Sequence, residues 1–123
     1  MLVHWHEDFE VGHAQSDGEH RHVVDLLNEL DLCLASGAVA AVVDRALGRL
    51  VAAVEMHFRH EEIESIDAVH QAEHDELLGR VLQLHDDWRA GVRMLDRQIL
   101  INLARWWLTH VRAHDAGEGV LIH

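Results

Sequence analysis

The chain has 123 residues and contains no proline. Because proline interrupts helices and marks turns, its absence favours long, uninterrupted helices. Apolar residues recur at spacings of three and four in four segments, as they do along one face of a helix. The predicted helices cover about residues 18–36, 38–64, 67–90 and 94–116, after an irregular N-terminal arm at 1–17. Short connections force each helix to run antiparallel to its predecessor, so we expect an all-α, up-down-up-down four-helix bundle that forms one domain over residues 1–123.

Residues that typically start and stop helices flank these segments. Asp17 is expected to be the N-cap of the first helix, because its side chain can accept a hydrogen bond from the first turn. Gly37 and Gly91 are expected to end the first and third helices, since glycine tolerates the left-handed conformation found there.

Acidic side chains dominate the charge of the chain. Twenty-two Asp and Glu residues oppose ten basic residues, for a formal net charge of −12. Nucleic acids and anionic membrane surfaces attract basic patches, and the sequence has none, so neither is an expected partner. No apolar run approaches the roughly 20 residues of a membrane span, and the N-terminus lacks the basic start and apolar stretch of a signal peptide. We therefore expect a cytoplasmic protein.

Histidine is the unusual component, with thirteen copies spread through the chain. In each predicted helix the apolar stripe continues into histidine or glutamate at one end. The second and fourth helices reach these polar ends going forward, whereas the first and third begin at theirs, so all four lie at one level of an antiparallel bundle. The residues that would converge are His20 on the first helix, His57 and Glu61 on the second, His70 and His74 on the third, and His110 on the fourth.

The types and spacing of these residues favour a metal site. Two pairs are four residues apart, which places both members on one helix face. Burying polar groups without partners costs roughly 2–7 kcal/mol each, and a divalent cation removes that cost. Imidazole and carboxylate without thiolate suit iron, zinc or manganese. A single core histidine is more often a hydrogen-bonded core residue than a ligand, but here four helices present such residues at one level. The histidines that leave the stripes are expected at the surface, and they are His22, His60, His85 and His114.

The same residues resemble the metal-binding pattern of the hemerythrins in their single-domain bacterial form. That pattern is a histidine on the first helix, His-x3-Glu on the second, His-x3-His on the third and His-x4-Asp on the fourth. The matching residues here are His20, His57 with Glu61, His70 with His74, and His110 with Asp115. Asp17-Gly-Glu-His20 is similar to the family's Asp-x-Gln-His, and Trp106 precedes His110 by four residues as the family's tryptophan does. The resemblance covers nearly the whole chain.

The resemblance implies a non-haem centre of two iron ions with an oxo or hydroxo bridge. Glu61 and Asp115 would be the carboxylates that bridge both irons. Three histidines would complete one iron, and two would hold the other and leave a position open for dioxygen; the two sets are His70, His74 and His110, and His20 and His57. The implied function is reversible dioxygen binding by a carrier, store or sensor. No substrate would be turned over, so an enzyme is not expected.

Dioxygen is apolar, so the open position should be lined by apolar side chains that also keep water away from it. The candidates lie within a turn of the predicted ligands, and they are Val23, Phe58, Trp106 and Trp107. Trp106 belongs to the predicted apolar stripe of the fourth helix, together with Ile99 and Leu103. Each pocket candidate could also be an ordinary core residue.

Two positions leave more than one candidate ligand. Asp115 follows His110 by five residues, about 140° round an ideal helix, whereas His114 at four residues is better in phase. His60 and Glu64 form a second His-x3-Glu, but they lie off the apolar stripe of the second helix. The connection before the third helix is also shorter than is usual in the family.

Other functions are compatible with this set of ligands. A di-iron oxidase, a peroxidase or a nitric oxide reductase would be an enzyme, and nitric oxide could replace dioxygen as the ligand. A zinc or iron storage module would hold metal without gas chemistry, and a sensor would act through a separate protein. Ferritin-like di-iron proteins use Glu-x-x-His pairs and more carboxylates, whereas five neutral imidazoles favour reversible binding.

Overall fold

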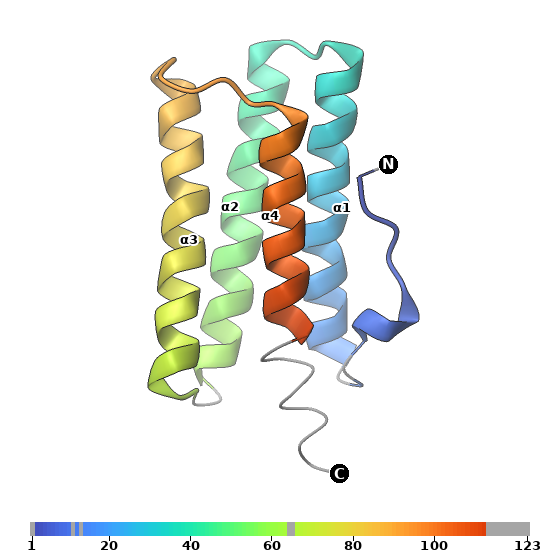
Figure 1. Cartoon of the computed structure of the whole chain (residues 1–123), viewed down its shortest axis with the longest axis vertical. Coiled ribbons are helices and arrows are strands. Elements are labelled where there is room, and N and C mark those ends of the chain that lie inside the picture. Colours follow the sequence, from blue (N-terminus) through green and yellow to red (C-terminus); the bar gives the residue numbers. More distant parts are fainter. Residues whose placement is uncertain (1, 11, 13, 64–65, 113–123) are drawn as a thin grey trace.

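Four helices run up and down along one axis in the computed structural model, which describes residues 2–10, 12, 14–63 and 66–112 (Figure 1). A short 3-10 helix, η1 (Glu7–Phe9), is followed by α1 (Ala14–Ser36), α2 (Ala40–Ile63), α3 (Ala68–Arg89) and α4 (Arg97–His110). α1 packs against α2 and α4, and α2 packs against α3. The prediction of an all-α antiparallel four-helix bundle is confirmed. None of the described helices is both long and apolar enough to cross a membrane.

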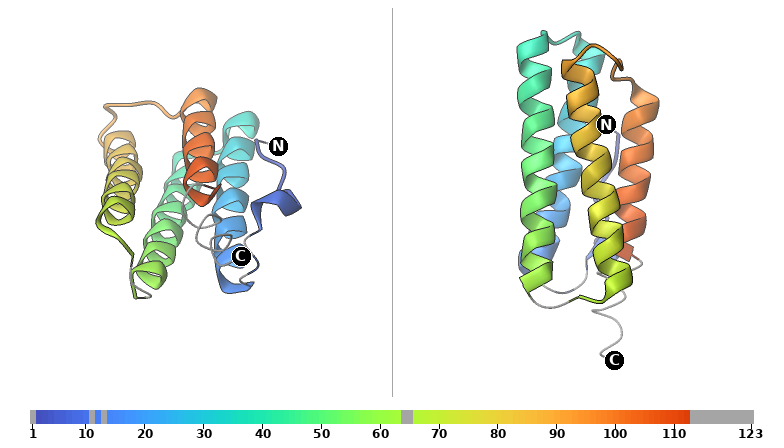
Figure 2. Two further views of the ribbon diagram at one scale, coloured as in Figure 1. Left: turned by 60° about the horizontal axis from the view of Figure 1, so that its bottom comes forward. Right: turned by 90° about the vertical axis from the view of Figure 1, so that its left-hand side faces the viewer.

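The antiparallel arrangement brings corresponding helix ends together. The connections from α1 to α2 and from α3 to α4 both lie at one end of the bundle (Figure 2). The start of α1, the end of α2, the start of α3 and the end of α4 lie at the opposite end (Figure 1). We call this opposite end the histidine end, because it is where the predicted ligands fall on the four helices.

The first helix begins earlier than predicted. α1 starts at Ala14, four residues before the predicted start, so the prediction that Asp17 is its N-cap is wrong. Asp17 lies in the first turn instead, where its negative charge faces the positive end of the helix dipole. The helix ends as predicted at Gly37, whose φ of +66° is left-handed. There the Ala38 N–H donates to the Cys33 carbonyl at 2.9 Å, which closes the last turn.

Aspartate caps set the starts of the third and fourth helices. Asp67 accepts a hydrogen bond from the backbone N–H of His70 at 2.7 Å, so the cap of α3 also fixes the backbone of a predicted ligand. Asp96 accepts one from the N–H of Ile99 at 2.9 Å. α4 therefore begins at Arg97, three residues after the predicted start.

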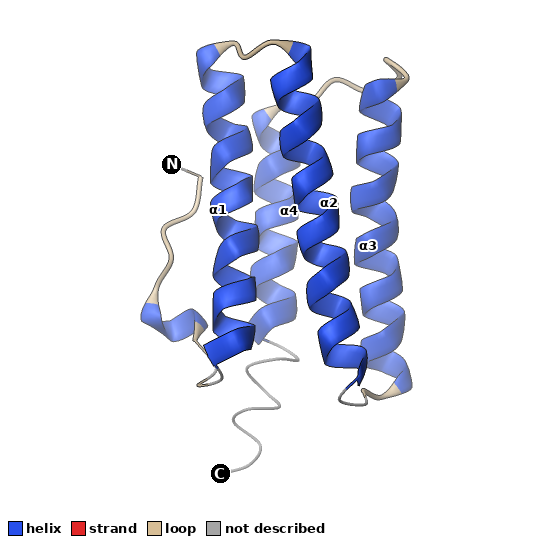
Figure 3. Ribbon diagram, turned by 180° about the vertical axis from the view of Figure 1, so that it is seen from behind, coloured by secondary structure: helices blue, strands red, loops and turns tan. Residues whose placement is uncertain are grey.

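The N-terminal arm runs along the outside of α1 (Figure 3). The backbone N–H of Val3 donates to Asn28 Oδ1 at 2.8 Å, and Asn28 Nδ2 donates to the Val3 carbonyl at 2.7 Å. The rings of Trp5 and Phe9 lie 5.4 Å apart between centroids. One asparagine side chain thus pairs with the arm as a neighbouring backbone segment would, which holds the arm against the bundle.

Large apolar side chains and histidines share the core. The largest fully buried apolar residues are Leu26, Leu27, Leu30, Leu47, Leu50, Phe58, Leu100 and Trp107. Along the last helix the buried apolar series is Leu100, Ala104, Trp107 and Val111, whereas Ile99, Leu103 and Trp106 are only partly buried. The apolar residues of α4 that face the core are therefore each one position later in the sequence than those of the predicted stripe.

Candidate metal centre

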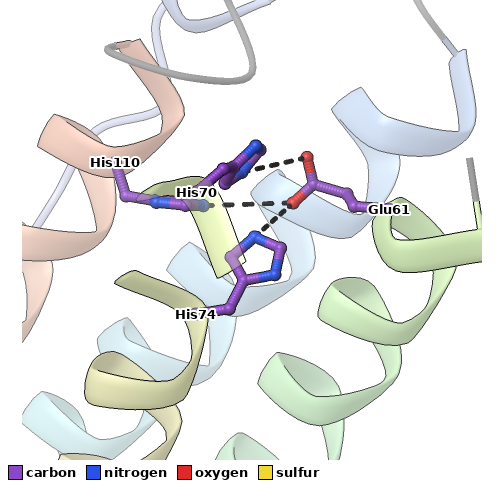
Figure 4. A group of neighbouring side chains, drawn as sticks. All are labelled: Glu61, His70, His74 and His110. Carbon is purple, nitrogen blue, oxygen red and sulfur yellow. Dashed lines mark ion pairs between the residues drawn. The ribbon is translucent and has the colours of Figure 1, made fainter. Parts of the chain in front are cut away.

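Glu61 lies among histidines from α3 and α4 at the histidine end (Figure 4). Its Oε1 is 3.2 Å from His74 Nε2 and 3.9 Å from His110 Nε2, and its Oε2 is 4.0 Å from His70 Nε2. One ligand atom from each of these four residues lies within 4.8 Å of the others. Atoms that bind one ion at about 2.1 Å are at most about 4.2 Å apart, so small shifts would close the group around a metal ion.

His20 and His57 extend this cluster to α1. Their Nε2 atoms are 2.9 Å apart, and His57 Nε2 is also 3.0 Å from Glu61 Oε1. Glu61 therefore joins the pair to the other three histidines. Together these six side chains, which come from all four helices, form one connected group that we call the inner group. The five histidines are at most 5 % exposed, and the Glu61 side chain is 11 % exposed.

Three further carboxylates contact the outer nitrogens of these histidines. The contacts are His57 Nδ1 with Glu19 Oε1 at 2.8 Å, His74 Nδ1 with Glu62 Oε2 at 3.1 Å, and His110 Nδ1 with Glu73 Oε2 at 3.8 Å. Each carboxylate is next in sequence to one member of the inner group, yet it contacts a histidine on the following helix. Adjacent residues on a helix point about 100° apart, so a neighbour of an inward-facing residue reaches across to the next helix.

The outer carboxylates fix which imidazole nitrogen carries the proton. A carboxylate only accepts hydrogen bonds, so Nδ1 of His57 and of His74 carries the hydrogen, and Nε2 of each neutral ring presents a lone pair to the interior. Such a lone pair is repelled by Glu61 Oε1 at 3.0 or 3.2 Å unless a cation or a proton lies between them. The inner group therefore fits a metal centre whose ligands are oriented by carboxylates behind them.

The electrostatics at His74 favour positive charge. Burial lowers the pKa of His74, but the hydrogen bonds with Glu61 and Glu62 outweigh burial and raise the pKa above the ordinary value of 6.5. A bound cation would supply the same positive charge and would compete with the proton for the imidazole.

Aromatic and aliphatic side chains cover the inner group on the core side. Phe58 stacks on His74 with ring centroids 3.9 Å apart, and Trp107 meets the rings of His20 and His57 at 5.9 and 5.5 Å. The Trp107 indole N–H donates to the backbone carbonyl of His20 at 3.3 Å. Next to Trp107 is a cavity of about 10 Å³ with an apolar lining, formed by Val23, Leu27, Leu50, Val54, Leu77, Val81, Leu103 and Trp107.

Comparison with known proteins identifies the family of the chain. The family model of the hemerythrin HHE cation binding domain matches residues 11–118. The chain belongs to the hemerythrin family. The bacteriohemerythrin of Methylococcus capsulatus is 30% identical over 111 residues, which cover 85% of this chain and 82% of that protein. The bacteriohemerythrin of Stenotrophomonas maltophilia is 27% identical over 119 residues, covering 93% and 77%.

Solved structures show the same fold. The crystal structure of a wild-type hemerythrin matches with a TM-score of 0.86 at 26% identity, covering 98% of this chain and 97% of that one. The crystal structure of a mutant protein matches with a TM-score of 0.88 at 27% identity, covering 97% and 95%.

The structure of this hemerythrin brings together six of the seven predicted ligands. They are His20, His57, Glu61, His70, His74 and His110. The seventh, Asp115, lies outside the described residues, as do its competitor His114 and the competing Glu64. His60, the partner of Glu64 in the competing pair, has its ring directed at Glu19 Oε2.

The four pocket candidates divide into two groups. Val23, Phe58 and Trp107 lie beside the histidines or line the small cavity. Trp106 instead is partly buried on the side of α4 that meets α3, where the Arg80 guanidinium covers its ring at 4.0 Å. It borders a groove of about 320 Å³, which Arg80 and Leu103 also line.

One histidine that was expected at the surface is buried. His85 is 8 % exposed, and its Nε2 donates to Asp44 Oδ1 at 2.8 Å, an oxygen that also accepts from Arg89 Nε at 2.7 Å. The prediction for His85 is wrong because this histidine follows the buried Val81 by four residues and so shares its face. His85 lies about 16 Å along α3 from His74, at ~1.5 Å per residue, so it ties α3 to α2 away from the candidate centre.

The sequence pattern did not predict a functional role for Glu19, Glu62 or Glu73. The signal available was their position, since each directly adjoins a predicted ligand in the sequence. Which histidine each one contacts depends on how neighbouring helices are rotated, and that is visible only in the structure.

Proposed function

We propose that this hemerythrin binds dioxygen reversibly at a non-haem di-iron centre, as a carrier, store or sensor. His70, His74 and His110 would hold one iron, and His20 and His57 would hold the other. Glu61 and Asp115 would bridge the two irons, together with an oxo or hydroxo group.

The position of Glu61 carries the proposal. Its Oε1 lies between the two proposed ligand sets, 3.0 Å from His57 Nε2 and 3.2 Å from His74 Nε2. A carboxylate that serves two metal ions has to stand between their remaining ligands. A carboxylate that served one ion alone would need contacts with only one of the two sets.

The chain's own residues support reversible binding rather than turnover. Bound iron would supply the electrons that dioxygen accepts on binding and returns on release. The five imidazoles add no negative charge to the centre, which disfavours highly oxidised iron, whereas ferritin-like oxidases use more carboxylates. Phe58, Trp107 and Val23 exclude water on the core side, and a dry surrounding keeps protons from reaching the bound gas.

The test is a metal count combined with a visible spectrum. The protein is purified in air, its iron and zinc are counted, and the spectrum is recorded before oxygen is removed, after removal and after readmission. Two irons per chain with an absorption band that vanishes and returns would support the proposal. A colourless zinc protein would refute it, and an irreversible bleach with release of peroxide would identify an oxidase. The same cycle with nitric oxide shows whether that gas binds in preference to dioxygen.

A further inference from the structure

Glu19 contacts two imidazoles at once. Its Oε1 accepts a hydrogen bond from His57 Nδ1 at 2.8 Å, and its Oε2 contacts His60 Nδ1. The Glu19 side chain is 21 % exposed, which makes it more buried than Glu62 at 34 % or Glu73 at 44 %. His60 is 39 % exposed, so the three residues link the protein surface to a fully buried member of the centre.

We propose that Glu19 and His60 form a positioning pair that makes His57 a stronger electron donor than the other histidines of the centre. This inference rests on the proposed di-iron function and adds to it a difference between the two irons. The iron held by His20 and His57, where the open position is placed, would be the one that the pair tunes.

The physical reason lies in the hydrogen bond to Nδ1. A carboxylate that accepts from Nδ1–H shifts electron density into the ring, so Nε2 binds a cation more tightly and stabilises its higher oxidation state. The effect is strongest when the carboxylate is held still and shielded from water. His60 occupies the second oxygen of Glu19, and this prevents the carboxylate from turning away from His57.

The sequence at this position supports a role for the charge. The chain has Glu19 where the Asp-x-Gln-His pattern of the resemblance has a neutral glutamine. An amide oxygen can accept the same hydrogen bond from His57, but it brings no net charge. Glu19→Gln therefore removes the charge while preserving the size and the hydrogen bond, which separates electrostatic tuning from simple packing.

The chain offers two matched controls. Glu62 contacts His74 of the other ligand set at 3.1 Å, so Glu62→Gln makes the same charge change behind the other iron. Glu55 pairs with Arg59 on α2, so Glu55→Gln makes the same charge change two residues from His57 in the sequence without touching the centre. His60→Gln replaces the imidazole that contacts the second oxygen of Glu19 and leaves the charge of Glu19 in place.

The experiment measures two properties of each variant. Metal-free protein is titrated with Co²⁺, whose visible bands report each bound ion, and the reduction potential of the iron-loaded protein is measured. Glu19→Gln should weaken one of the two Co²⁺ sites by about 10- to 100-fold and raise the reduction potential. His60→Gln should shift both properties in the same direction by less, Glu62→Gln should weaken the other Co²⁺ site, and Glu55→Gln should match the unmodified protein.

The outcomes separate this inference from the proposed function. If Glu19→Gln and His60→Gln both retain two metals and match Glu55→Gln in affinity and potential, the positioning pair is refuted while the di-iron function stands. If the unmodified protein binds fewer than two ions, the di-iron function itself fails. Weakening of both sites equally by Glu19→Gln would also overturn the inference, because it would indicate a general structural role.

Discussion

The Nε2 atoms of His20 and His57 lie 2.9 Å apart, and both side chains are fully buried. In neutral His57 the one ring hydrogen lies on Nδ1 and is donated to Glu19. Its Nε2 then carries a lone pair, which can accept a hydrogen bond from His20 or bind a cation. The same nitrogen faces the negative oxygen of Glu61 at 3.0 Å. A metal ion placed among these atoms would replace repulsion by attraction, so the fold and the metal should depend on each other.

Removing metal should therefore lower the stability of the protein. A ligand present at about 1,000 times its Kd adds about 4 kcal/mol to the free energy of unfolding. We expect chelation to lower the midpoint of thermal unfolding, followed by circular dichroism, and anaerobic addition of Fe²⁺ to restore it. An unchanged midpoint after complete removal would show that the histidine cluster is stable by itself.

Two buried histidines on α3 should respond differently to substitution by alanine. His74→Ala removes a side chain that faces Glu61, so the protein should retain less iron. His85→Ala breaks the bond to Asp44 about 16 Å along the helix, so it should cost about 1–3 kcal/mol in unfolding free energy and keep the full iron content. Metal analysis and urea unfolding of both variants check this, and equal iron in the two would contradict the ligand assignment.

The adjacent tryptophans of α4 provide a second matched pair. Trp107 is 2 % exposed and touches the histidine rings, so Trp107→Ala should cost about 3–5 kcal/mol and change the visible spectrum of the iron-loaded protein. Trp106→Ala loses the contact with Arg80, which is worth about 0.5–1 kcal/mol, and part of its packing. The spectrum of iron-loaded Trp106→Ala should match that of the unmodified protein. A spectral change as large as that of Trp107→Ala would show that Trp106 belongs to the pocket.

Asp44 should contribute to stability in a pH-dependent way. The hydrogen bond from Arg89, and then that from His85, lowers the pKa of Asp44 from 3.8 to about 2. The folded protein therefore binds this proton less readily than the unfolded chain, so the contribution is present above pH 3.8 and is lost as the pH falls to about 2. In metal-free protein, the difference in urea midpoint between the unmodified chain and Asp44→Asn should shrink over that interval. A constant difference would mean that the charge of Asp44 has no part in it.

The choice between Asp115 and His114 can be decided by iron content. Asp115→Asn replaces a bridging carboxylate with a neutral amide, so the protein should lose iron, whereas His114→Ala should retain two irons per chain. The reverse result would assign the ligand by helical phase, because His114 is the residue four positions after His110.

Helical periodicity explains what the sequence could predict. Histidines and glutamate at i and i+4 had to share a helix face, and antiparallel connections had to bring those faces to one end, so the cluster around Glu61 followed from spacing. Periodicity determines a face only to within about one residue. Trp106 and Trp107 are about 100° apart on α4, and the structure turns the second of them inward.

Contacts between helices could not be predicted in the same way. His85 is in phase with Val81, but the reason it can be buried is Asp44 on another helix. Its Nε2–H finds an acceptor only because α2 and α3 pack with a particular rotation and offset. The spacing of residues along one sequence does not fix this offset, and the contacts of the outer carboxylates Glu19, Glu62 and Glu73 could not be predicted for the same reason.

The pattern of outer carboxylates links residues that belong to different helices. Glu19 on α1 orients His57 on α2, Glu62 on α2 orients His74 on α3, and Glu73 on α3 faces His110 on α4. A chimaera that takes α2 or α3 from a relative would thus separate a histidine from its carboxylate at both borders of the exchanged segment. Exchange of the pair α1–α2 or the pair α3–α4 breaks only one of these contacts and should be better tolerated. Changes at positions 19, 62 and 73 should occur together with changes near positions 57, 74 and 110 as such proteins diverge.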